Sequence, residues 1–253
     1  MARIDYDERT AAAYRAAREI PRDGLSEWRD AVLRHLRPAS GMTVVDIGAG
    51  TGQFATAFSD WFGIRVVAVE PSGSMRARIP REHDIQVVEG TADALPLPDE
   101  SADGAWLSLV LHHIRDLEAA AREIRRVLRP GAPVLIRGGV SGTTHDGIEN
   151  VRWFPETART IDTFPSVDET CTVFARAGFQ LAALEQVRET YPQSLAGYLE
   201  QIDTLRHADT TMQSLTDEEF ARGKERVRRA VRAAERNGSS EPRTNWLDLL
   251  VLR

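Results

Sequence analysis

Short hydrophobic runs alternate with longer segments of helical period between residues 38 and 138. The runs predict strands near 43–47, 65–69, 85–88, 103–109 and 132–137. This alternation is typical of a parallel sheet that helices cover on both faces. The pattern therefore predicts a doubly wound α/β fold, in which a ligand binds beyond the carboxyl ends of the strands.

The pattern changes on both sides of this core. Residues 5–37 predict two helices, and Pro38 stops the second of them. Residues 139–165 contain glycines, prolines and aromatics without a clear period, which predicts an irregular insertion. Further signals predict capped helices that begin after Ser166 and Thr216, and final strands at 180–190 and 246–252.

A glycine-rich loop follows the first predicted strand. The chain reads Val-Val-Asp-Ile-Gly-Ala-Gly-Thr-Gly over residues 44–52. The glycines allow the backbone to turn sharply and to approach a ligand, and the next helix directs free N–H groups toward it. A dinucleotide fingerprint requires a further glycine where this chain has Gln53. The spacing therefore disfavours a nicotinamide oxidoreductase.

Two acidic residues flank this loop. Asp46 precedes the first glycine by two positions, and its charge would repel a pyrophosphate and attract an ammonium or sulfonium group. Glu70 ends the second predicted strand, about 20 residues past the loop, where a ribose diol is held in such folds. A cationic cofactor that contains ribose fits both acids.

Five motifs in this order resemble the class I S-adenosylmethionine-dependent methyltransferases of the small-molecule type. They lie at 45–52, 69–72, 89–99, 103–114 and 123–136. The resemblance implies a Rossmann-like, mostly parallel, seven-stranded sheet with an antiparallel last strand and a helical cap. It also implies a single domain over 1–253, with a cofactor-binding core at 38–138 and cap or substrate-side elements at 1–37, 139–165 and 191–240.

The same resemblance implies S-adenosyl-L-methionine as cofactor and a set of residues around it. Arg18 would suit the cofactor's carboxylate, and Glu70 its ribose hydroxyls. Thr91 stands where the family often has Asp, so the contact to the adenine amine would pass to Asp93 or to backbone. The expected cofactor-binding residues are Tyr14, Arg18, Asp46, Gly48, Ala49, Gly50, Glu70, Pro71, Met75, Thr91, Ala92, Ser108 and Leu109.

For methyl transfer the protein must orient the cofactor and the acceptor, exclude water and, for some acceptors, remove one proton. His112 and His113 follow the fourth predicted strand and are candidate general bases, with packing as the alternative role. His145 in the insertion is a third candidate. Aromatic residues suit a small-molecule pocket, and the candidates for substrate contact are Trp153, Phe154, Tyr191 and Tyr198.

These features predict methyl transfer to an O, N or C nucleophile of a small metabolite or natural product. A non-catalytic cofactor-binding sensor or partner subunit is the alternative. The net charge of -6 disfavours a nucleic-acid partner. Because no segment has about 20 consecutive apolar residues, we expect no membrane span and a cytoplasmic location. The long insertions predict a substrate lid or a dimer contact, and the chain is expected to be a monomer or homodimer.

Overall fold

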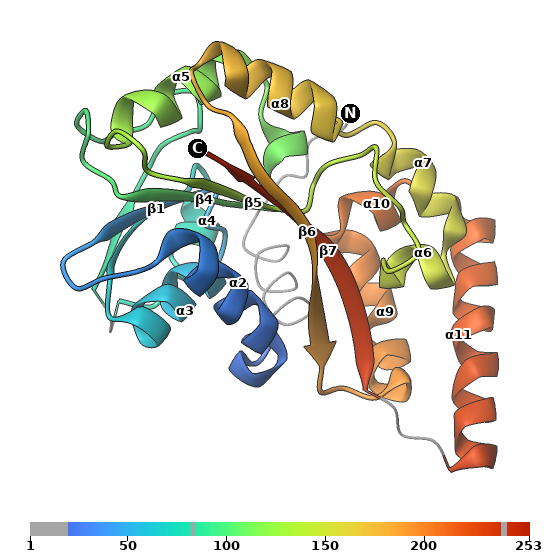
Figure 1. The fold of residues 1–253 in the computed structure, drawn as a ribbon. Coiled ribbons are helices and arrows are strands. Elements are labelled where there is room, and N and C mark those ends of the chain that lie inside the picture. The colour runs from blue at the N-terminus through green and yellow to red at the C-terminus, as the bar shows by residue number, and fades with distance from the viewer. Residues whose placement is uncertain (1–19, 82–83, 239–241) are drawn as a thin grey trace. The chain divides into compact units, whose positions relative to one another are not determined.

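The computed structural model describes residues 20–81, 84–238 and 242–253 (Figure 1). Its chain divides into two compact units. The first, called the sheet unit here, contains 29–142, 164–187 and 248–253. The second, called the helical unit, contains 143–163, 188–247 and the segment that ends at Trp28. The predicted core lies in the sheet unit, and the predicted insertions lie mainly in the helical unit; function as a single domain stays a prediction.

The seven strands form one sheet in the order β3-β2-β1-β4-β5-β7-β6. The first five pair in parallel, and β7 is antiparallel to β5. The predicted fold class, with its antiparallel last strand, is confirmed. The strands are β1 Thr43–Ile47, β2 Arg65–Val69, β3 Ile85–Val88, β4 Gly104–Ser108, β5 Val134–Arg137, β6 Leu181–Tyr191 and β7 Arg243–Leu252.

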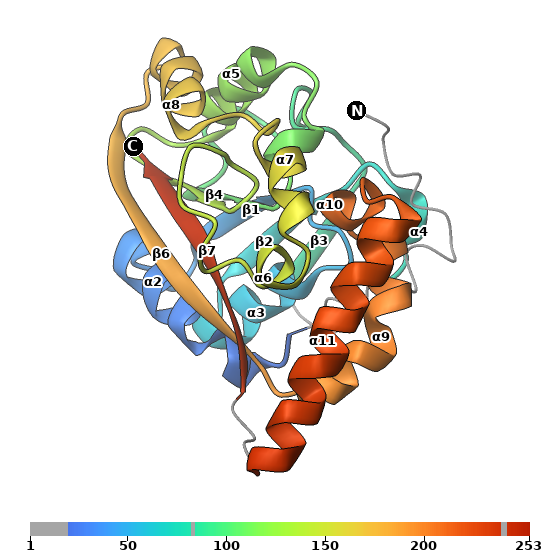
Figure 2. The same ribbon diagram turned by 90° about the vertical axis from the view of Figure 1, so that its right-hand side faces the viewer.

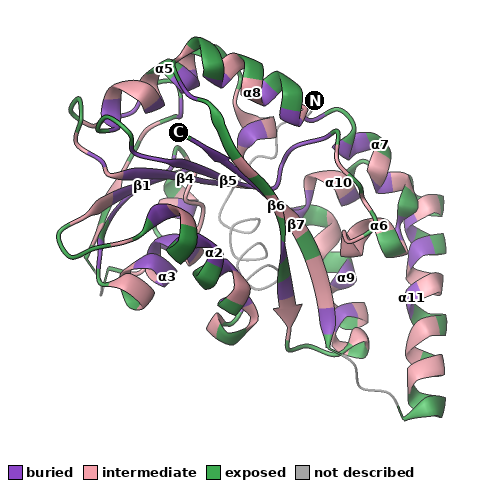
Figure 3. Ribbon diagram, in the orientation of Figure 1, coloured by how far each residue is buried: buried purple, intermediate pink, exposed green. Residues whose placement is uncertain are grey.

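Alternate residues of the central strands face different helices. Val44 lines the same space as Leu36 and Phe58, which belong to α2 and α3. Val45 belongs instead to the core that Ile124 of α5 enters, together with residues of α8. Figure 3 shows β1, β4 and β5 as mostly buried. The helices are α2 Ser26–Leu36, α3 Gln53–Phe62, α4 Gly73–Arg76, η2 Leu111–His113, α5 Leu117–Val127 and α8 Val167–Arg176.

The helical unit has a hydrophobic core of its own. It contains Phe154 from the insertion together with Tyr198, Phe220 and Val227 from the later helices. Figure 2 shows the two long helices of this unit, α9 and α11, side by side. The insertion forms helical pieces of three to five residues, which are too short to produce a helical period in the sequence. The unit's helices are η1 Arg22–Leu25, α6 Glu149–Trp153, η3 Pro155–Thr157, α7 Ala158–Ile161, α9 Leu195–Ala208, α10 Thr210–Gln213 and α11 Asp217–Asn237. Within the described ranges, no helix combines the length and apolar character that crossing a bilayer requires.

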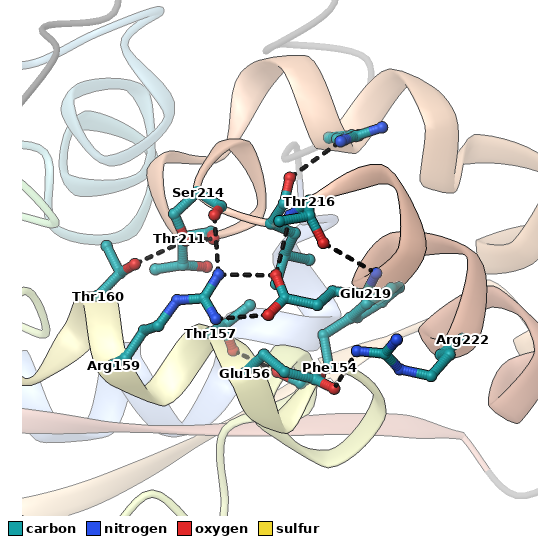
Figure 4. Close-up of polar contacts among 12 residues, drawn as sticks. Phe154, Glu156, Thr157, Arg159, Thr160, Thr211, Ser214, Thr216, Glu219 and Arg222 are labelled. Atoms are coloured by element: carbon teal, nitrogen blue, oxygen red, sulfur yellow. Dashed lines mark hydrogen bonds and ion pairs between the residues drawn. The ribbon is translucent and has the colours of Figure 1, made fainter.

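A polar cluster ties α7 to the start of α11 (Figure 4). Thr216 and Glu219 form the predicted capping box, in which each side chain accepts a hydrogen bond from the other's backbone N–H. Arg159 donates to both carboxylate oxygens of Glu219 at 2.6 and 2.7 Å, and to the Ser214 carbonyl oxygen at 2.9 Å. One carboxylate therefore caps a helix and anchors the insertion.

Replacing Glu219 with Gln is expected to destabilise the helical unit at neutral pH. The hydrogen bond from Arg159, with that from the Thr216 amide, lowers the pKa of Glu219 to about 2 from 4.5. Its stabilisation is fully present above pH 4.5 and is lost as the pH falls toward 2. Urea unfolding at pH 7 and at pH 2.5 measures this: the two proteins should differ at pH 7 and converge in acid. Equal unfolding midpoints at pH 7 would contradict the role of the pair.

Candidate functional site

The glycine loop lies at the carboxyl end of β1 and is fastened to β2. The amides of Gly48 and Ala49 both donate to the carbonyl oxygen of Val69, at 2.8 and 3.1 Å. Gly48 has φ +72°, and a Cβ atom there would lie 2.5 Å from Val110. Gly52, with φ +83°, is the N-cap of α3. Only glycine fits this path, so the sequence-based placement of the loop is confirmed.

Glu70 lies directly after β2 and its carboxylate is fixed by backbone. It accepts hydrogen bonds from the amides of Gly50 and Ser72, each at 2.9 Å, and the residue is 7% exposed. Arg76 fastens the same turn by donating to the carbonyl oxygens of Glu70 and Pro71 at 2.8 and 2.7 Å. The carboxylate is therefore held next to the glycine loop. A carboxylate has about four lone-pair sites, so it can accept further hydrogen bonds.

Asp46 is the penultimate residue of β1 and is 2% exposed. Burial, and then repulsion from Glu70, raise its pKa from 3.8 to about 7, although a hydrogen bond from the Ala55 amide opposes the shift. A buried carboxyl group beside a second carboxylate is a favourable environment for a positive charge. Asp46 and Glu70 together fit a cofactor that carries hydroxyl donors and a cationic centre.

The predicted adenine loop follows β3. The Ala94 amide donates to the Thr91 carbonyl oxygen at 3.2 Å, which makes a tight turn. Ala92 within this turn is 9% exposed, whereas Thr91 and Asp93 are exposed. Met75, 2% exposed, lies in α4, whose first turn is capped by Ser72. The contacts of these residues with a cofactor stay predictions.

The ends of β4 and β5 form the next part of this edge. Leu109 has φ +54°, which is rare for a leucine, and its amide donates to the Arg137 carbonyl oxygen at 2.8 Å. The Arg137 side chain, 4% exposed, donates to Ser108 Oγ at 2.9 Å and lies over the Phe54 ring at 5.1 Å. Strained residues of this kind gather at functional sites. Neither Arg137 nor Phe54 was predicted as a site residue, because neither the hydrophobic pattern nor a motif distinguishes them from ordinary core or surface residues.

His112 and His113 lie in the η2 turn after β4. The His112 ring stacks on Phe164 at 4.0 Å with 10° between the planes, and it meets the His113 ring at 4.0 Å and 46°. Ser141 holds Phe164 through a 2.8 Å bond from its Oγ to the Phe164 carbonyl oxygen. A Cβ atom on Gly139 would lie 3.2 Å from His112 Nδ1. The His112 ring is thus tightly packed. Its contact with Phe164 could not be predicted from the sequence, because the two residues are far apart along the chain.

The structure places the remaining predicted residues in the helical unit or outside the described ranges. His145 forms a pair with Asp162, and Trp153 ends α6. Phe154 and Tyr198 are 0% and 2% exposed in the core of the helical unit, so packing accounts for both. Tyr191 lies at the end of β6, where its hydroxyl donates to Glu189 at 3.2 Å. Tyr14 and Arg18 lie outside the described residues. Substrate contact by the four aromatics stays a prediction.

Comparisons with known proteins agree with this geometry. The methyltransferase domain family matches residues 45–136. A demethylmenaquinone methyltransferase of Roseiflexus is 38% identical over 112 residues, which cover 43% of this chain and 47% of that protein. A ubiquinone/menaquinone biosynthesis C-methyltransferase UbiE of Caulobacter vibrioides is 32% identical over 142 residues, which cover 51% and 56%. The chain spans about half the length of these curated relatives.

A solved structure shows the same fold over most of the chain. It is titled a putative methyltransferase from an antibiotic biosynthesis pathway of Anabaena variabilis, and it has a TM-score of 0.67 at 20% identity. The match covers 89% of this chain and 95% of that one. The family match begins at Val45 and ends at Ile136, so it contains Asp46, the glycine loop and Glu70 but none of the helical unit.

Proposed function

Because the chain carries the domain of the class I S-adenosylmethionine-dependent methyltransferases, we propose that it transfers a methyl group to a small-molecule acceptor. The observation that carries this proposal is the Glu70 carboxylate, which the amides of Gly50 and Ser72 hold against the glycine loop. S-adenosyl-L-methionine is the cofactor of this family, so the cofactor prediction is confirmed at the level of the family. When bound, it supplies an electrophilic methyl group on a sulfonium.

We assign the cofactor to the residues of the sheet unit. Glu70 accepts hydrogen bonds from the ribose hydroxyls, Asp46 faces the cationic portion, and the glycine loop approaches through backbone. The turn at Thr91 and Ala92 contacts the adenine ring. The cofactor-binding residues proposed in the described part of the chain are Asp46, Gly48, Ala49, Gly50, Glu70, Pro71, Met75, Thr91, Ala92, Ser108 and Leu109.

The acceptor proposed is an aromatic ring of the quinol type, with carbon as the accepting atom. The relatives from Roseiflexus and Caulobacter, whose names state menaquinone or ubiquinone chemistry, support this class. An oxidised quinone ring is too electron-poor to attack an electrophilic methyl group, whereas a quinol that loses a hydroxyl proton becomes nucleophilic at ring carbon. A proton acceptor is therefore required, and His112, His113 and His145 are the candidates.

Replacing Glu70 with Gln is expected to weaken binding of S-adenosylhomocysteine by about 10- to 100-fold, because hydrogen bonds to charged groups contribute roughly 1.5–3 kcal/mol. Isothermal titration calorimetry measures this, with NAD as the control ligand. Glu200→Gln is the matched variant, since Glu200 is exposed on α9, and it should bind as the wild type does. Failure of the wild type to bind at micromolar concentration, or binding of NAD instead, would overturn the proposed function.

The sensor or partner-subunit alternative predicts the same binding without turnover. A short-chain demethylmenaquinone, reduced under anaerobic conditions, is the first acceptor to test, followed by phenols, amines and carboxylic acids. Methylated product identified by mass spectrometry supports the enzyme. Tight cofactor binding with no product across these acceptor classes favours the sensor.

A further inference from the structure

Arg76 is the last residue of α4 and reaches three acceptors with one guanidinium group. Its Nη1 atom donates to the carbonyl oxygens of Glu70 and Pro71 at 2.8 and 2.7 Å. Its Nη2 atom donates to Oε2 of Glu89 at 2.6 Å. Its backbone amide also donates to the Ser72 carbonyl oxygen at 2.9 Å, so backbone and side chain hold the same turn. The planar fork of arginine serves such a set of acceptors at fixed angles, which the single nitrogen of a lysine cannot do.

The two acids that Arg76 connects leave neighbouring strands side by side. Val69 of β2 and Val88 of β3 are register partners, and Glu70 and Glu89 follow them directly. Glu70 is 7% exposed beside the glycine loop, whereas the Glu89 side chain is 73% exposed. Because Arg76 pairs with the outer acid, a guanidinium charge compensates the repulsion that Glu89 would exert on the Glu70 carboxylate.

Glu89 begins the loop that contains the predicted adenine turn at 91–94. The next residue, Gly90, lies tightly against the end of β2. A Cβ atom there would lie 2.6 Å from Pro96 Cδ and 3.0 Å from a methyl group of Val69, so the path requires a residue without a side chain. The start of the adenine loop is therefore fastened at two consecutive residues, one by an ion pair and the other by close packing against β2.

From these contacts, we infer that Arg76 is a positioning residue for the adenosine part of the cofactor, which rests on the methyltransferase function proposed above. Arg76 fixes the turn in which the Ser72 amide orients the Glu70 carboxylate at 2.9 Å. Through Glu89 it also fixes the loop that carries the adenine turn. The ribose and the adenine of one nucleoside are joined covalently, so the two segments that hold them must keep a constant separation. Arg76 acts on the cofactor through these residues.

Folding stability alone does not explain the bond to Glu89. An ion pair whose partner is exposed contributes little to stability, because water screens both charges and the long side chains lose freedom. A fixed separation between two binding segments is a different gain, since it lowers the cost of ordering them when the ligand binds. We therefore expect Glu89→Gln to leave the urea unfolding midpoint nearly unchanged and to weaken cofactor binding by about threefold.

The test measures calorimetric affinity for two probes, S-adenosylhomocysteine and methylthioadenosine, which carries the adenosine without the amino acid. Arg76→Gln is expected to weaken binding of both probes by about tenfold. Arg76→Lys, which keeps the charge but not the fork, should weaken it less. Arg122→Gln is the matched control, because Arg122 is exposed on α5 in the same unit. This control should bind both probes as the wild type does.

A double-mutant cycle separates positioning from general damage to the fold. If Arg76 acts through the two acids, adding Arg76→Gln to the variant Glu70→Gln/Glu89→Gln should weaken methylthioadenosine binding by about twofold or less, rather than tenfold. A purely structural arginine would lower the unfolding midpoint and leave the affinity of the folded protein unchanged. If Arg76→Gln does not fold, Arg76→Lys and Glu89→Gln carry the same test.

Three results would overturn the inference. The first is unchanged affinity for both probes in the Arg76 variants. The second is a loss confined to S-adenosylhomocysteine, or a wild type that binds it but not methylthioadenosine. The third is an equal loss on adding Arg76→Gln to the wild type and to the variant that lacks both acids. A wild type that binds neither probe is a different outcome, since it overturns the proposed function itself.

Discussion

Replacing Asp46 with Asn is expected to stabilise the cofactor-free protein at pH 8 and to weaken cofactor binding. Burial, followed by repulsion from Glu70, raises the pKa of Asp46 in the folded state from its ordinary value of 3.8 to about 7. The native state therefore holds a proton that the unfolded state releases, so the free energy of unfolding falls as the pH rises from about 4 to 7. Above pH 7 the full penalty applies, which is about 4 kcal/mol for a shift of this size.

The amide of Asn has nearly the shape of the carboxyl group and no charge, so the variant escapes this penalty. We expect a gain in unfolding free energy of about 2–4 kcal/mol at pH 8 that shrinks by half or more at pH 5. Urea unfolding at both pH values measures it. Asp30→Asn is the matched control, because Asp30 is exposed on α2. If the gain were equal at pH 5 and pH 8, the pKa of Asp46 would not be raised by burial in the folded state.

The same variant should bind S-adenosylmethionine at least tenfold more weakly. A cation bound near Asp46 favours the ionised carboxylate, so binding recovers the electrostatic energy that burial costs, and Asn offers no such recovery. The ligand thus relieves a destabilisation of the cofactor-free protein. This is a common form of the trade-off between stability and function. Calorimetry in buffers of different ionisation enthalpy should show proton release near pH 7 for the wild type and less for Asp46→Asn.

Elements whose structure depends on neighbouring residues could be predicted from the sequence. β1, β2 and β3 occupy the residue ranges predicted, because β-branched runs between turn residues suit buried parallel strands. The glycine loop and both capping boxes were also predicted, since each depends on residues at most eight positions apart. Asp46 and Glu70 were placed at the same edge of the sheet for a different reason: each stands at the carboxyl end of a predicted strand, and the carboxyl ends of parallel strands share one edge.

Contacts between distant segments could not be predicted in this way. Phe164 stacks on His112 from 52 positions away, and Arg159 meets Glu219 from 60 positions away. Phe154 was expected to contact a substrate because it lies in an aperiodic segment with aromatics. The structure buries it completely, because a helix that begins more than 60 residues later supplies a glycine where its ring lies.

The glycine that lies against the Phe154 ring is Gly223. Replacing Gly223 with Ala should destabilise the helical unit by about 2–4 kcal/mol, because the added methyl group overpacks a filled core. A Cβ atom at position 223 would lie 2.0 Å from both Cδ1 and Cε1 of Phe154. The ring cannot move aside easily, because Phe154 is 0% exposed and stacks on Phe220 at 5.6 Å. Helix propensity alone predicts the opposite sign, since alanine is favoured over glycine by about 1 kcal/mol in a helix interior.

Gly197→Ala in α9 separates these two effects. Its Cβ atom would meet neighbours at 3.7 and 3.8 Å, which is ordinary contact, so this variant should be neutral or slightly more stable. Hydrogen exchange of the α9 and α11 amides, with urea unfolding, measures both variants. Equal stability of the two would show that Phe154 does not fill the space above Gly223. Removing the ring tests the cause directly: Phe154→Ala should cost less in the Gly223→Ala background than in the wild type, because the new methyl group then occupies space that the ring has left.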